Sequence, residues 1–232
     1  MGVQRVCVLL IGAMLVVAVA PIVGATTLNI TLDTTPLTLP PGSSTAPFSV
    51  FFQLTDGSGT NDGNNTVTLT NFAFGGGSAT PGTTLFGGAV GDLGSSVVLT
   101  DNSFLNSFTQ GFTPGSTLSF QLQMTTNVDA GGTPDAFAFG ILDSTGFPIP
   151  TTDPSLADTF LAINIDSQNP TVLTYGTDSS RTNIAISAPS VSLATTPVPE
   201  PATLFLVGGG ILAGAVRRRS RSDQRQVPQR TA

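Results

Sequence analysis

Between residues 26 and 196, apolar and polar residues alternate at every second position in several short runs. The most regular is Thr117–Thr125, where Leu, Phe, Leu and Met fall on one face and polar residues fall on the other. A period of two places successive side chains on opposite faces of an extended chain, which predicts a strand with one buried face. The same pattern recurs in LNITL (28–32), FSVFFQL (48–54) and LAINI (161–165).

Weaker runs extend this reading to most of the central region. The run NTVTLTNFAF (65–74) changes phase after Leu69, which predicts a bulge near Thr70–Asn71. Further strands are predicted at Ser96–Leu99, Phe104–Phe108, Ala136–Leu142, Thr171–Tyr175 and Asn183–Ser187. Clusters such as DGSGTNDGNN and GGGSATPG predict turns between them. We therefore expect an all-β fold, a two-sheet antiparallel β-sandwich that is jelly-roll-like, with fourteen phenylalanines to fill its core.

The first 25 residues have the pattern of a secretory signal peptide. Arg5 precedes the apolar run VCVLLIGAMLVVAVA, and small residues before Thr26 place the cut by signal peptidase between Ala25 and Thr26. An uncleaved N-terminal membrane anchor is the alternative.

The other end of the chain has the pattern of a short membrane helix. The run 202–216 is fifteen residues without a charge, about 22 Å long as a helix, against a hydrocarbon core of ~30 Å. Four arginines that follow it predict a cytoplasmic end: Arg217, Arg218, Arg219 and Arg221. This orientation agrees with the export that the N-terminal pattern predicts.

The tripeptide Pro199-Glu200-Pro201 precedes this apolar run, and its two prolines hold the backbone extended. The tripeptide, apolar helix and arginine cluster, in this order, resemble the PEP-CTERM sorting signal of exported bacterial proteins over residues 197–221. The resemblance implies that exosortase, a membrane-embedded processing enzyme, is a partner and removes the tail near Glu200, so that the membrane anchor is transient. The tail Ser222–Ala232 is longer than the family usually has.

The central region also resembles a family of exported PEP-CTERM proteins that is known by sequence and not by activity. The similar stretches are FFQLTDGSG, NNTVTLTNFAFGGG, FTPGSTLSFQLQMTTN, FAFGILD and IPTTDPSLADTFLAINID. This resemblance implies no particular activity.

Together these patterns divide the chain into five segments. They are a signal peptide (1–25), a β-sandwich domain (26–187), a linker that begins with a last strand (188–198), the sorting signal (199–221) and a cytoplasmic tail (222–232). The stretch 26–196 has one arginine and twelve aspartates, a net charge of −11. Such a domain repels phosphates, so we expect no nucleic-acid partner.

The composition excludes several kinds of chemistry. The chain has no histidine, and its one cysteine is Cys7 in the predicted signal peptide. The mature domain therefore lacks thiolate nucleophiles, disulfides and the usual general base near neutral pH. We expect no catalytic residue and no enzymatic activity.

Calcium is the cofactor for which the domain has suitable residues. Asp56, Asp62 and Asn64 bring oxygen ligands to a glycine-bent loop, although their spacing does not fit an EF-hand. Other aspartates that would complete such a site are Asp92, Asp101, Asp143, Asp153, Asp158 and Asp166. The alternative is that Asp, Asn and Gly simply form tight turns here.

Three functions remain for the domain. The first is a non-enzymatic protein of the cell envelope or the exopolysaccharide matrix. The second is a calcium-stabilised carbohydrate-binding module with exopolysaccharide as its partner, although Tyr175 is its one tyrosine and it has no tryptophan. The third is a polysaccharide hydrolase that uses Asp153 and Asp158. Arg181 is expected to pair with a nearby acid such as Asp178.

Overall fold

The computed structural model describes residues 25–38, 47–58, 61–128, 132–167 and 169–194. These residues form twelve strands and one turn of 3-10 helix, η1 (Thr35–Leu37). The strands are β1 (Ala25–Asp33), β2 (Phe48–Thr55), β3 (Thr66–Ala73), β4 (Ser78–Phe86), β5 (Gly88–Gly91), β6 (Val97–Thr100), β7 (Leu105–Thr113), β8 (Thr117–Thr125), β9 (Asp135–Leu142), β10 (Leu161–Ile165), β11 (Thr171–Thr174) and β12 (Ser190–Leu193). Every described strand pair is antiparallel, which confirms the predicted class.

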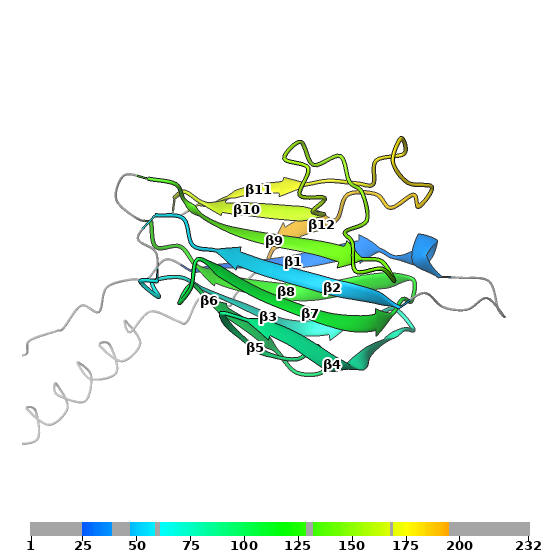
Figure 1. Cartoon of the computed structure of the whole chain (residues 1–232), viewed down its shortest axis with the longest axis horizontal. Helices are drawn as coiled ribbons and strands as arrows, with labels where there is room; N and C mark the ends of the chain where they lie inside the picture. Colours follow the sequence, from blue (N-terminus) through cyan, green and yellow to red (C-terminus); the bar gives the residue numbers. More distant parts are fainter. Residues whose placement is uncertain (1–24, 39–46, 59–60, 129–131, 168, 195–232) are drawn as a thin grey trace, which may run out of the picture. The chain divides into compact units, whose positions relative to one another are not determined.

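The strands form two six-stranded sheets that face each other (Figure 1). Sheet A has the order β12-β1-β8-β3-β6-β5, and sheet B has the order β11-β10-β9-β2-β7-β4. The first eight strands follow the jelly-roll order, 1-8-3-6 opposite 2-7-4, except that β5 pairs with β6 and not with β4. Of the last four strands, β12 extends sheet A beside β1, and β9, β10 and β11 extend sheet B beside β2.

The core lies between the sheets because each long strand other than β4 turns its apolar residues inward at every second position. Phe52 on β2 is fully buried at its centre. Its ring contacts five others, with centroid separations from 5.3 to 6.2 Å: Phe72, Phe108, Phe120, Phe137 and Phe139. These rings come from both sheets, so aromatic packing joins the two layers.

Some sequence predictions were confirmed and others were wrong. The bulge in β3 is present between Thr70 and Ala73, and Asn71 has a left-handed φ of 57°. The strand predicted at Asn183–Ser187 is wrong, because this segment pairs with no strand and is held by hydrogen bonds between Ile186 and Thr177.

Strands β4 and β5 were not predicted, and part of β4 was read as a turn. β4 contains Pro81 and Gly82, is largely exposed and shifts its register between Ala79 and Thr83, so it shows no alternation. Proline is tolerated there because β4 is an edge strand. The expected last strand is present as β12, which pairs with β1.

Several predicted segments lie outside the described residues. They are the signal peptide up to residue 24, the sorting motif, the apolar helix, the arginine cluster and the tail. Among the described residues, no helix has the length and apolar character needed to cross a bilayer.

Candidate functional site

One end of the core is lined by polar side chains that continue the inward-facing positions of the strands. Asp56 follows Leu54 of β2 in this alternation, and Asp101 follows Leu99 of β6. We call the whole set the polar end layer, and each of its members is at most 3% exposed: Asp56, Asn65, Asp101, Asn106, Thr126 and Asp135. Where the inward-facing positions of a strand end with a polar residue, that residue is therefore buried at the edge of the core.

Asn65 connects the two sheets within this layer. Its backbone N–H donates to Asp101 Oδ2 at 2.8 Å on sheet A, and its Nδ2 donates to Asp135 Oδ2 at 2.7 Å on sheet B. The other oxygen of Asp135 accepts the backbone N–H of Gly57 at 2.8 Å. Buried carboxylates are thus held by a few neutral donors at this end of the sandwich.

The environment of Asp101 disfavours its charge. Burial raises the pKa of Asp101 to about 7, and the nearby negative charges of Asp135 and Asp62 act in the same direction, against the hydrogen bond from Asn65. The side chains of Asp101 and Asp135 lie within hydrogen-bonding reach of each other. Three buried oxygens of this layer have no hydrogen-bond partner: Asp56 Oδ1, Asp101 Oδ1 and Thr126 Oγ1.

The residues predicted to bind calcium are divided between this layer and the surface. Asp56 is fully buried, and its Oδ2 accepts the backbone N–H of Asn61. Asp62 is exposed and accepts hydrogen bonds from both nitrogens of Asn64, at 3.2 and 2.8 Å. Within the described part of the chain, no three Asp or Glu side chains lie close enough to hold a metal together. Calcium at Asp56, Asp62 and Asn64 stays a prediction.

The remaining aspartates named with them lie in other turns. Asp92, Asp143 and Asp166 accept hydrogen bonds within their own turns. Sequence reasoning missed Asn65, Thr126 and Asp135. Following each alternating run one step beyond its last apolar residue would have found them.

A groove of about 380 Å³ lies on the outer face of sheet B. Its floor is formed by small residues on two neighbouring strands: Ala136 and Ala138 on β9 and Ala162 on β10. Longer side chains flank these alanines on both sides, because Gln53 of β2 pairs with Ala138 and Leu173 of β11 pairs with Ala162. The loop 153–157 and Thr159 close another side, so the hollow follows from the difference in side-chain size.

Polar groups line this groove beside one aromatic ring. Gln53, Thr55 and Asn164 present amide and hydroxyl groups, and Tyr175 follows β11 at the edge. Burial raises the pKa of Tyr175, and the negative charge of Asp153 raises it further. The phenol is therefore a neutral hydrogen-bonding group next to a carboxylate.

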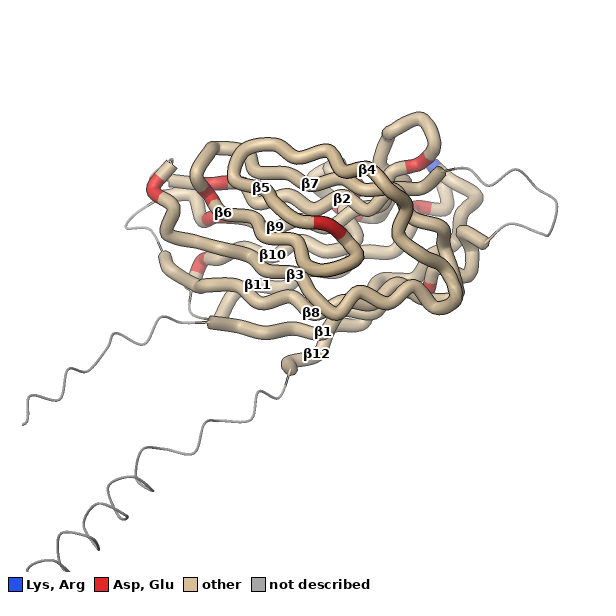
Figure 2. Tube along the Cα trace, turned by 90° about the horizontal axis from the view of Figure 1, so that it is seen from below, with Lys and Arg blue, Asp and Glu red and all other residues tan. Residues whose placement is uncertain are grey.

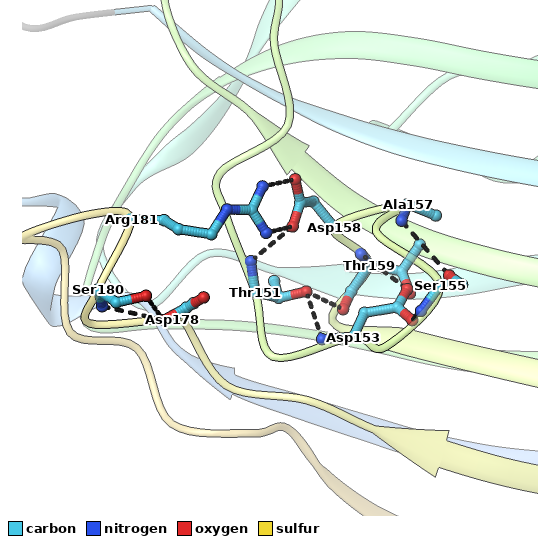
Figure 3. Close-up of polar contacts among 9 residues, drawn as sticks. All are labelled: Thr151, Asp153, Ser155, Ala157, Asp158, Thr159, Asp178, Ser180 and Arg181. Atoms are coloured by element: carbon cyan, nitrogen blue, oxygen red, sulfur yellow. Dashed lines mark hydrogen bonds and ion pairs between the residues drawn. The ribbon is translucent and has the colours of Figure 1, made fainter.

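Asp153 organises the loop at the groove (Figure 3). Its Oδ1 accepts bonds from the N–H and hydroxyl of Ser155 at 2.9 and 2.7 Å, and its Oδ2 accepts the Thr159 hydroxyl at 2.7 Å. Burial alone would raise the pKa of Asp153, but these hydrogen bonds outweigh it and lower the pKa. The carboxylate is thus engaged in shaping the loop.

The other acid of the hydrolase alternative, Asp158, is engaged by Arg181. The guanidinium donates two hydrogen bonds to this carboxylate, at 2.7 and 2.6 Å, and Thr151 N–H donates a third at 3.0 Å (Figure 3). The expectation that Arg181 pairs with an acid is confirmed. The example named, Asp178, is wrong, because its carboxyl accepts bonds from Ser180 in its own turn. Asp158 has a left-handed φ of 56°, a strained conformation that this brace supports.

Charge is unevenly distributed among the described residues. Figure 2 shows the acidic residues in loops and at strand ends, with the sole described basic residue, Arg181, beside one of them. The sheet faces, including the floor of the groove, carry few charges. An uncharged ligand would therefore meet the least repulsion on these faces.

The fold and these surfaces define an anionic, two-sheet β-sandwich protein. The family model for the PEP-CTERM protein-sorting motif matches residues 197–220 of the chain. No curated protein and no solved structure matches it. The chain is thus a protein with a PEP-CTERM sorting motif, which marks an exported protein sorted to the cell envelope through processing by exosortase. This confirms the resemblance seen at its C-terminal end.

Proposed function

We propose that the mature chain is a non-enzymatic protein of the cell envelope or the exopolysaccharide matrix. The sorting motif carries this proposal, since it accounts for export and processing. The predicted signal peptide at residues 1–25 supports the same route, with signal peptidase acting at one end and exosortase at the other. The predicted helix at 202–216 would hold the chain in the membrane only until exosortase acts.

The state of the acidic groups supports a non-enzymatic role. A glycosidase needs one carboxylic acid that gives a proton and one carboxylate that attacks or activates water. Asp153 is hydrogen-bonded to Ser155 and Thr159, and Asp158 is paired with Arg181. The pKa of Asp153 is lowered by its hydrogen bonds, which is opposite to the shift that a general acid needs.

The processing step is tested by changing Glu200, the one charge of the motif. In the native host, we expect wild-type protein to end near residue 200, as mass spectrometry of its C-terminus would show. We expect Glu200→Gln to keep its arginines and stay in the membrane fraction. Asp223→Asn, which removes one carboxylate from the tail, is the matched control and should be processed normally. A wild-type protein that keeps its arginines, or normal processing of Glu200→Gln, contradicts the proposal.

The groove on sheet B favours a second candidate function, the binding of a neutral glycan of the matrix. Tyr175 supplies an amphipathic ring, and amide and hydroxyl groups that can bond to sugar hydroxyls stand beside it. The braced loop at Asp153 keeps this surface ordered before binding, which lowers the entropy lost on association. The net negative charge of the domain favours uncharged sugars over acidic ones.

Affinity electrophoresis of the full chain in gels that contain neutral or acidic polysaccharides tests this candidate. We expect retardation by a neutral polysaccharide, and at least about a tenfold weaker affinity for Tyr175→Ala, since a stacked ring contributes ~1–3 kcal/mol in comparable contacts. Phe147→Ala removes an aromatic ring that is 70% exposed and outside the groove, so it should bind normally. Equal binding by both variants would reject the groove as the site and leave the sorting proposal unaffected.

A further inference from the structure

The polar end layer holds more negative charge than its own groups compensate. Asp56, Asp101 and Asp135 are each at most 3% exposed. The only basic side chain of the described residues, Arg181, is paired with Asp158. A buried carboxylate without a counter-charge is costly, and neutral N–H donors compensate only part of that cost.

The unpaired oxygens of this layer are a second and separate observation. Asp56 Oδ1 and Asp101 Oδ1 have no hydrogen-bond partner. The hydroxyl of Thr126, an uncharged residue that is 3% exposed, also has none. Buried polar atoms in folded proteins nearly always have a partner, so three orphans in one layer point to a partner from outside the chain.

The strand register brings these groups together. β3 pairs with β6 from Thr66 opposite Thr100, and with β8 from Val67 opposite Met124. Continuing both ladders places Asn65 between Asp101 on one side and Thr126 on the other. Asn65 also donates to Asp135 on the opposite sheet, at 2.7 Å. Asp101 and Thr126, which carry two of the orphan oxygens, are therefore neighbours of the same asparagine, and continuing the β2–β9 ladder places Asp56 opposite Asp135.

We propose that the polar end layer is a Ca²⁺ site, in which the ion lies between Asp101 and Asp135 and takes the unpaired hydroxyl oxygen of Thr126 as a further ligand. All of these ligands are oxygens, which calcium prefers, and the layer offers no nitrogen or sulfur ligand to a transition metal. Because no three acidic side chains of the described residues lie close enough together to hold one ion, the ligands of this site are two carboxylates and neutral oxygens.

This site differs from the loop set expected from the sequence and shares no ligand with it. An ion here would connect β6 of sheet A to β9 of sheet B at the end of the core, and would replace repulsion between two carboxylates by attraction. The inference does not rest on glycan binding or on sorting.

The competing explanation is that Asp101 and Asp135 share one proton. Asp101 is surrounded by further acids, Asp135 on β9 and Asp62 in the loop after β2, and its burial favours the neutral form. Proton sharing and calcium binding predict different responses to added metal, and the experiment is designed around that difference.

The full chain, purified in mild detergent and treated with EDTA, would be dialysed against increasing Ca²⁺ at pH 8, with bound calcium and Tm measured in parallel. We expect one ion per chain and a Tm that rises with calcium concentration by mass action. Asp101→Asn should lose both responses, yet without calcium its Tm should equal or exceed that of wild type, because an amide can donate to Asp135. Asp92→Asn changes an exposed turn residue and should respond as wild type does.

Wild type supplies a second readout that does not depend on any variant. Protons compete with calcium for the same carboxyl groups, so its calcium affinity should fall between pH 8 and pH 5. Absence of binding to wild type at millimolar calcium and pH 8 would overturn the proposal in favour of a shared proton. An unchanged calcium response in Asp101→Asn would overturn it as well.

Discussion

The buried pair of Asp101 and Asp135 predicts an unusual dependence of stability on pH in the absence of metal. The pKa of Asp101 is about 7 in the folded protein, against 3.8 as the ordinary value. Between these values the folded chain binds a proton that the unfolded chain has released. The free energy of unfolding should therefore fall as the pH rises from about 4 to about 7 and level off above that, and the replacement Asp101→Asn should remove this fall.

The size of the effect follows from proton linkage. One proton changes the free energy of unfolding by at most about 1.4 kcal/mol per pH unit. Over the full pH window, the free energy of unfolding would fall by about 4 kcal/mol. Screening by water at the end of the sandwich reduces the expected fall to roughly 2 kcal/mol. Hydrogen bonds lower the pKa of Asp143, Asp153 and Asp178, so these groups lose their stabilising contribution only when the pH falls through their lowered values. These three groups therefore do not obscure the fall in stability that is expected above pH 4.

Urea unfolding in EDTA at half-unit steps from pH 4 to 8.5 measures this dependence. Wild type and Asp92→Asn should lose stability across the window, and Asp101→Asn should stay nearly level. The reasoning is refuted if wild-type stability is flat or rises from pH 4.5 to 7.5, or if Asp101→Asn keeps the wild-type slope.

Two further predictions concern the core and the loop at the groove. Phe52→Ala removes a fully buried ring that packs against five others, so it should lower the free energy of unfolding by about 4 kcal/mol in urea denaturation, whereas Phe147→Ala should change it by less than about 0.5 kcal/mol. A loss below about 1.5 kcal/mol for Phe52→Ala would contradict the central packing. Arg181→Met leaves Asp158 with the Thr151 N–H alone and should speed limited proteolysis at 153–159, and Arg181→Lys should do so less, since it keeps the charge but not the paired geometry. Equal cleavage rates in wild type and Arg181→Met would show that the ion pair does not hold the loop.

The candidate sites were only partly visible in the sequence. Asp56 was expected as a metal ligand, and its burial in the polar end layer could have been read from the alternation that begins at Phe48. Asp135 lies 79 positions later and meets it only because β9 pairs with β2 in sheet B. The partner of Arg181 was missed for the same reason, because a short turn satisfies Asp178 locally and the fold brings Asp158 from a distant loop.

The sequence by itself determined the all-β class and the inward face of each long strand except β4, because a period of two acts within a few residues and needs no distant partner. It also determined the sorting motif, which is a local pattern of prolines, one acid, an apolar run and arginines. Only the tertiary structure decided the order of the strands, the groove above the alanines of β9 and β10, and the meeting of Asp101 with Asp135. These depend on pairing between segments far apart in the chain, and local alternation carries no information about which strand will lie beside which.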